Sequence, residues 1–125
     1  MVDYTGKNAE GLKEKTLYLL DMDGTIYNEN EIFEGTLDLL REIEERGGQY
    51  VFITNNSSKS VEDYIEKVRA MGIQASYENF YTSSQATAMY LQENYANQRV
   101  YCMGTRSLVE ELRRAGISVV TEVDE

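Results

Sequence analysis

Two short apolar runs, each followed at once by small polar residues, constrain the fold of this chain most. Residues 17–20 (LYLL) lead into DMDGT, and residues 50–53 (YVFI) lead into TNNSSKS. Such runs, bounded by turn-forming residues, are typical of buried strands. In open α/β sheets, ligands bind beyond the carboxyl ends of the strands. The sequence therefore predicts a site after these two strands.

The rest of the chain alternates between helical and strand patterns. This alternation predicts an α/β fold: a Rossmann-like parallel sheet with flanking helices. Residues 22–34 are expected to form a polar loop, and Ser60 with Asp63 resembles a capping box at the start of a helix. The other predicted helices are 36–46, from Ser83 or Ser84 to about 95, and 108–115, and the further strands are 80–82, 99–103 and 117–121.

Asp21 and Asp23 are the strongest candidates for chemistry. Two carboxylates this close repel each other unless a cation lies between them, and Mg²⁺ is a hard ion that prefers oxygen ligands and often bridges to phosphate. Asp21 is placed to act as a nucleophile that forms an aspartyl-phosphate. Asp23 is placed to protonate the leaving oxygen and later to activate water.

A phosphate-binding loop is expected around the two strand ends. Gly24 permits a sharp turn and close approach of the backbone. Thr54, with the backbone amides of Asn55 and Asn56, is expected to hold the phosphoryl oxygens. Asp21 and Thr54 are about one strand–helix–strand unit apart, so their strands are expected to be neighbours.

Composition excludes several kinds of site and partner. Histidine is absent and Cys102 is the single cysteine, which excludes Ser-His and Cys-His nucleophiles, an intrachain disulfide and a cysteine cluster for zinc. The net charge of −10 argues against nucleic acid and anionic membranes as partners. No apolar stretch is long enough to span a membrane and no signal peptide is evident, so a cytoplasmic location is expected.

The acidic segment also permits other interpretations. A D-x-D-G-T segment on its own is usually a surface turn, and its glycine is in the wrong position for an EF-hand loop. A receiver-like domain that accepts a phosphoryl group also places acidic residues at strand ends, but here no later strand ends in an aspartate. A non-catalytic interaction fragment with an acidic pocket remains an alternative.

The motifs resemble those of the haloacid dehalogenase superfamily. DMDGT is similar to its first motif and FITNN to its second, and TNNSSKS, TSSQATAMYL and RVYCMGT resemble its p-nitrophenyl phosphatase, or NagD-like, branch. The resemblance implies a Mg²⁺-dependent phosphatase of small phosphorylated metabolites. It also implies that Asp21 is the nucleophile, that Asp23 is the acid/base and ligates Mg²⁺ through its backbone carbonyl, and that Thr54 is the motif-two threonine.

The resemblance covers only the first part of that family's pattern. The lysine of the third motif and the acidic pair of the fourth are not matched, because Lys59 and Lys67 lie in the wrong place and are expected to be solvated helix residues. We therefore expect a lead-in at residues 1–15, the N-terminal part of a catalytic core at 16–81 and the beginning of an α/β cap at 82–125. The partial core is expected to expose a strand edge that permits a homodimer.

Overall fold

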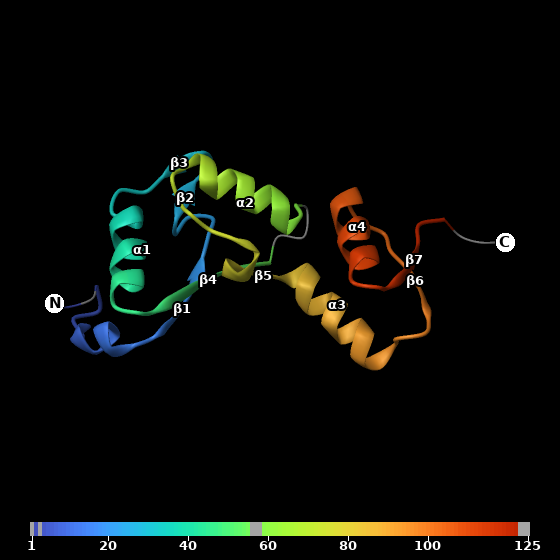
Figure 1. The fold of residues 1–125 in the computed structure, drawn as a ribbon, viewed down its shortest axis with the longest axis horizontal. Coiled ribbons are helices and arrows are strands. Elements are labelled where there is room, and N and C mark those ends of the chain that lie inside the picture. Colours follow the sequence, from blue (N-terminus) through green and yellow to red (C-terminus); the bar gives the residue numbers. More distant parts are fainter. Residues whose placement is uncertain (1, 3, 56–58, 123–125) are drawn as a thin grey trace.

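The structure is a computed structural model that describes residues 2, 4–55 and 59–122. It consists of two parts joined end to end (Figure 1). The first contains a three-stranded sheet with two helices and a small hairpin, and the second contains two helices and a two-stranded sheet. Each part has its own hydrophobic cluster. No helix within the described ranges has both the length and the apolar character that a membrane span requires.

The first sheet is parallel, with the strand order β1-β4-β5. Its strands are β1 (Leu17–Asp21), β4 (Gln49–Thr54) and β5 (Phe80–Thr82). Helices α1 (Thr36–Glu45) and α2 (Val61–Ala70) pack on one face of this sheet, where Leu40 and Val68 meet Phe52 in the hydrophobic cluster. The predicted parallel α/β architecture is therefore confirmed for this part.

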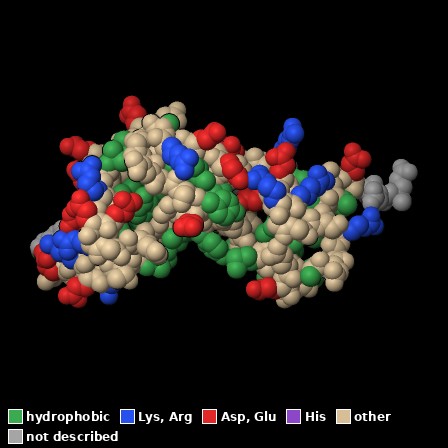
Figure 2. Space-filling model, in the orientation of Figure 1, with side chains coloured by type: hydrophobic (Ala, Val, Ile, Leu, Met, Phe, Trp, Pro, Cys, Tyr) green, Lys and Arg blue, Asp and Glu red, His purple; other side chains and the backbone are tan. Residues whose placement is uncertain are grey.

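The opposite face of the sheet carries no helix in the described part of the chain. Leu17 and Leu19 of β1 are 55% and 59% exposed, and Ile53 and Tyr81 on the neighbouring strands are also exposed. β1 is an edge strand of this sheet. Hydrophobic side chains also gather along the concave rim between the two parts (Figure 2). The expected exposed edge is present, whereas association of two copies through it stays a prediction.

The segment expected to be a polar loop contains a hairpin instead. Strands β2 (Tyr27–Asn28) and β3 (Glu31–Ile32) pair antiparallel. Three residues at the start of this segment, Met22, Ile26 and Tyr27, are almost fully buried. The prediction of a polar loop was wrong because these apolar side chains reach the main cluster from a turn, where neither helical nor strand periodicity reveals them.

Most helix starts follow from their caps. Ser60 and Asp63 form the predicted capping box at the start of α2. The cap of α3 (Ser83–Asn94) is Thr82 rather than Ser83 or Ser84: its hydroxyl accepts a hydrogen bond from the Gln85 amide. α4 (Arg106–Arg114) begins earlier than expected because Thr105 caps it. The remaining elements are β6 (Arg99–Tyr101), β7 (Ser118–Val120) and the 3₁₀ helices η1 (Glu10–Glu14) and η2 (Tyr77–Asn79).

Candidate active site

Asp21 is the last residue of β1, and its side chain is exposed. The chain turns immediately after it, where the amides of Thr25 and Ile26 both donate to the Met22 carbonyl. This turn brings the Thr25 hydroxyl back to Asp21, with 3.4 Å between Thr25 Oγ1 and Asp21 Oδ2. The sequence-predicted nucleophile is thus an accessible carboxylate at the carboxyl end of a strand.

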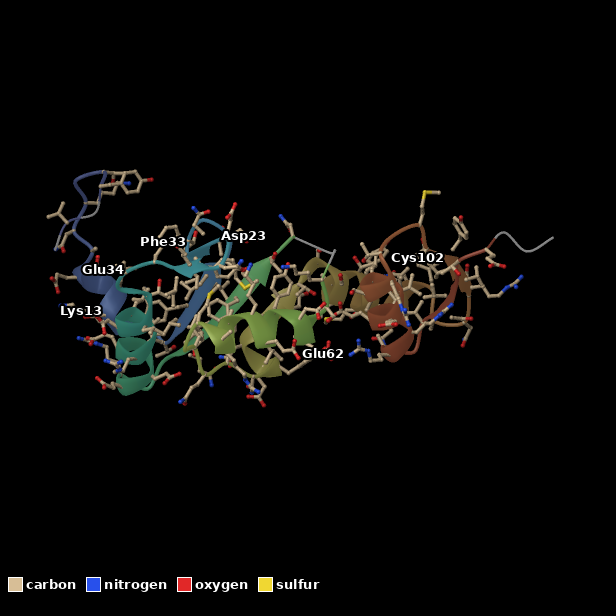
Figure 3. The ribbon with its side chains drawn as sticks, turned by 90° about the horizontal axis from the view of Figure 1, so that it is seen from above. Lys13, Asp23, Phe33, Glu34, Glu62 and Cys102 are labelled. Carbon is tan, nitrogen blue, oxygen red and sulfur yellow. The ribbon has the colours of Figure 1, made fainter. Side chains whose placement is uncertain are left out.

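Asp23 and Gly24 form the turn that leads from β1 to the hairpin. Gly24 has φ +80°, a left-handed conformation that side chains disfavour, and its amide donates to the Tyr27 carbonyl at 2.9 Å. Asp23 forms an isolated bridge with Tyr27, and its side chain is exposed. In Figure 3, Asp23 lies beside the β2–β3 hairpin. The turn therefore holds Asp21 and Asp23 at the same end of the sheet.

Thr54 ends β4, the strand next to β1. Its side chain is buried, on the face of the sheet that carries α2. The next residue, Asn55, is exposed, and its carbonyl accepts a hydrogen bond of 3.1 Å from the Ser83 hydroxyl at the start of α3. Asn56, the other predicted phosphate-binding residue, lies outside the described residues.

Two tyrosines that the sequence analysis did not single out lie next to these groups. The Tyr27 and Tyr64 hydroxyls are buried and have no hydrogen-bond partner of good geometry among the described residues. Burial raises the pKa of Tyr27, and the negative charge of Asp23 raises it further. Burial also raises the pKa of Tyr64, whereas the neighbouring Thr54 hydroxyl lowers it. Tyr64 could have been found from its helical spacing with Val61 and Val68.

Lys67 was expected to be a solvated helix residue, and the structure places it differently. It is half-buried, and its ammonium group lies over the ring of Tyr27, with 4.2 Å from Nζ to the ring centroid. The prediction of a solvated helix residue was wrong because the hairpin brings an aromatic face to α2, which a sequence pattern does not reveal. Cation–π contacts of this kind contribute on the order of 0.5–1 kcal/mol at exposed sites. Lys67 therefore ties the turn that carries Asp23 to α2.

The donor atoms at the end of β1 suit a hard cation. Asp21 offers a carboxylate, and the neighbouring turn offers backbone carbonyls, the oxygen ligands that Mg²⁺ accepts. No group of three or more acidic, cysteine or histidine side chains that could hold a metal occurs among the described residues. The residues present would therefore fit Mg²⁺ only as an open site with few protein ligands, whose remaining positions water would fill.

Comparison with known proteins identifies the family. Residues 18–118 match the haloacid dehalogenase-like hydrolases. This chain belongs to that family. The predicted resemblance is thereby confirmed, and the matched residues include both strand ends described above.

Two curated relatives of this haloacid dehalogenase-like chain are named as a nucleotidase and a sugar phosphatase. It is 33% identical to the 5'-nucleotidase YutF of Bacillus subtilis, over 81% of this chain and 40% of the relative. It is 34% identical to an acid sugar phosphatase of Staphylococcus epidermidis, over 86% of this chain and 42% of the relative. The chain thus spans about 40% of the length of these relatives.

Solved structures of the same family share the fold. The 4-nitrophenylphosphatase of Thermotoga maritima superposes with a TM-score of 0.84 at 33% identity, over 90% of this chain and 43% of that one. The glycerol phosphate phosphatase of Mycobacterium tuberculosis, solved in complex with magnesium, superposes with a TM-score of 0.78 at 28% identity, over 86% of this chain and 32% of that one. Both similarities confirm the Rossmann-like core of this branch.

Proposed function

We propose that this chain carries the nucleophilic part of a phosphoric monoester hydrolase that acts on small phosphorylated metabolites. The observation that carries the proposal is the position of Asp21, an exposed carboxylate at the carboxyl end of β1, beside the end of β4. The names of the relatives support the reaction class, since they include a nucleotidase, a sugar phosphatase and a glycerol phosphate phosphatase.

The proposed reaction has two steps. An Asp21 carboxylate oxygen attacks phosphorus, the ester P–O bond breaks, and Asp23 donates its proton to the departing alcohol oxygen. Water then attacks the phosphorus of the aspartyl-phosphate and gives a proton to Asp23. The P–O bond to Asp21 breaks, which restores its carboxylate and releases inorganic phosphate.

Mg²⁺ is part of this proposal. The Asp21 carboxylate and the Asp23 backbone carbonyl would hold it, and the ion would neutralise negative charge on the phosphoryl group. The protein's own contribution is to position these oxygens: the turn through Gly24 fixes Asp23, and the Thr25 hydroxyl orients the Asp21 carboxylate. The magnesium complex of a family member supports the choice of ion.

The loop after β4 is proposed to bind the phosphoryl oxygens. The Thr54 hydroxyl, the amides of Asn55 and Asn56, and the backbone at Gly24 are the proposed contacts. The hydrogen bond from Ser83 to the Asn55 carbonyl supports this role, because it anchors the start of the loop to α3. Donors that are fixed before the substrate arrives stabilise transition-state charge most effectively.

The partner proposals follow from charge and from the exposed strand. The net charge of −10 favours small substrates over nucleic acid or anionic membranes. The exposed apolar residues Leu17 and Leu19 on edge strand β1 favour self-association into a homodimer as a second property of the chain. A cytoplasmic location also belongs to the proposal, since the free thiol of Cys102 suits a reducing compartment.

The test of the proposed function is hydrolysis of 4-nitrophenyl phosphate by the 125-residue chain with excess Mg²⁺. We expect slow release of 4-nitrophenol, because no residue of this chain matches the lysine of the third motif. The loss of one such electrostatic donor lowers the catalytic rate about a hundredfold to a thousandfold. Asp21→Asn should reduce the rate to the protein-free blank, with the far-UV circular dichroism spectrum unchanged. Turnover by Asp21→Asn equal to that of the parent chain would refute the proposal.

A further inference from the structure

A cavity lies away from the candidate active site, between the two parts of the molecule. Its volume is about 450 Å³, within the usual range of small-molecule sites. The wall combines aromatic, apolar and charged side chains from α2, η2, β5, α3 and α4, and includes Glu62, Tyr77, Tyr81, Met89, Glu111 and Arg114. None of the proposed active-site residues that the structure describes lines it. In Figure 3, Glu62 lies at the end of α2 that faces α4, apart from Asp23.

Glu111 is the unusual member of this wall. The residue is only 8% exposed, and neither carboxylate oxygen has a hydrogen-bond partner among the described residues. Burial raises the pKa of Glu111 and the negative charge of Glu62 raises it further, whereas Arg114 lowers it. A buried carboxyl group without a hydrogen-bond donor is destabilising, because it has lost its hydration and gained no partner. Glu111 thus lies in the cavity wall, and its two carboxylate oxygens are buried behind that wall without a donor.

The negative charge of Glu111 is only partly compensated by its neighbours. Arg114 forms an ion pair with Glu62, which joins α4 to α2. The single guanidinium of Arg114 therefore interacts with two carboxylates, those of Glu62 and Glu111. The sum of these three charges is negative. The rings of Tyr77 and Tyr81 and the thioether of Met89 complete the wall with surfaces that suit an apolar or aromatic body.

We propose that this cavity binds a small organic amine, whose ammonium group donates to Glu111 while its apolar body packs against Tyr77, Tyr81 and Met89. The Glu111 side chain has three rotatable bonds, which allow its carboxylate to turn toward a donor in the cavity. An ammonium group supplies the missing hydrogen bonds and the missing positive charge together. The aromatic walls favour a cation further. The net charge of −10 attracts such a ligand from solution.

The probe for this site is 2-phenylethylamine, with 2-phenylethanol as its uncharged counterpart of similar shape. Both are titrated into the full chain labelled with ¹³C at the methionine methyl groups, because Met89 lies in the cavity wall. We expect the Met89 signal to shift saturably with the amine, with an affinity at least about tenfold higher than that for the alcohol. Equal affinities, or no saturable shift of Met89, would overturn the proposal.

Two variants distinguish a specific role of the Glu111 carboxylate from an effect of the net charge of the chain. Glu111→Gln keeps the size of the side chain and removes its charge, so amine affinity should fall about tenfold or more. Glu93→Gln makes the same charge change at an exposed position of α3 and should leave amine binding unchanged. Unchanged binding in a folded Glu111→Gln, or an equal loss in Glu93→Gln, would contradict the site. Neither outcome bears on the proposed hydrolase, because Asp21 is not involved.

Discussion

Asp21 and Ile53 are register partners in the parallel pair of β1 and β4, so Thr54 lies one residue beyond the position opposite Asp21. Side chains alternate between the faces of a strand. The Asp21 carboxylate accordingly lies on the open face, with exposed Leu19, and Thr54 lies on the face covered by α2. The two groups can therefore share one ligand only beyond the carboxyl ends of the strands.

This relationship predicts the effect of removing the Thr54 hydroxyl. Thr54→Val should weaken binding of inorganic phosphate about tenfold or more in the presence of Mg²⁺, because a hydrogen bond to a charged group contributes about 1.5–3 kcal/mol. Thr54→Ser keeps the hydroxyl and is the matched control. A ³¹P chemical-shift titration measures both, and a Val variant that binds phosphate like the parent chain would exclude Thr54 from the site.

The turn through Gly24 should be sensitive to any side chain. Gly24 has φ +80°, and a methyl group placed there would meet no atom within 4 Å, so the strain comes from the backbone alone. Gly24→Ala should lower the free energy of unfolding by about 1–2 kcal/mol. Gly11→Ala, also in open space but without positive φ, is the control. Urea unfolding of the two variants should differ by about that amount; equal stabilities would show that the turn is not strained.

Alkaline pH should reveal the buried Tyr27 hydroxyl. Its pKa in the folded chain is raised above the ordinary value of 10.0, so the unfolded chain loses this proton first as the pH rises. The folded chain then holds more protons, and stability falls above about pH 10. Tyr27→Phe should make that fall less steep, whereas Tyr4→Phe, at a fully exposed position, should not. Denaturant unfolding between pH 8 and pH 11 measures the slopes; parallel slopes for Tyr27→Phe and the parent chain would contradict the burial effect.

Self-association should depend on the open face of the sheet and on salt. Leu19→Lys places a charge on edge strand β1 and should shift the chain toward monomer in size-exclusion chromatography with light scattering. The control is Leu39→Lys, which makes the same change at an exposed position of helix α1, away from the strand edge. Added salt should favour the dimer, because it screens the repulsion between two chains of charge −10. A parent chain that stays monomeric at high salt would refute the homodimer.

The regular elements could be predicted from sequence because local patterns determine them. Residues 17–20 and 50–53 are continuous apolar runs, and the Ser60–Asp63 capping box marks the start of α2. The adjacency of β1 and β4 followed from a single crossover and was correct. Such features depend on neighbours in the chain, which a sequence displays directly.

The surroundings of the site could not be predicted in the same way. Tyr27 and Lys67 meet through the hairpin, a contact between segments far apart in sequence that no periodicity encodes. The burial of Met22 and Ile26 arises in a turn, so a polar loop was the wrong expectation. The face on which Thr54 lies depends on strand register, which becomes visible only when β1 and β4 are paired.

Covalent trapping tests the central claim most directly. The chain is incubated with Mg²⁺ and a reactive phosphoryl donor such as acetyl phosphate, quenched with borohydride and digested for mass spectrometry. An aspartyl-phosphate at position 21 is reduced to homoserine, so the account predicts homoserine at Asp21 in the parent chain and none in Asp21→Asn. Homoserine at another aspartate, or no reduction product at Asp21 in a folded chain, would contradict the assignment of Asp21 as the nucleophile.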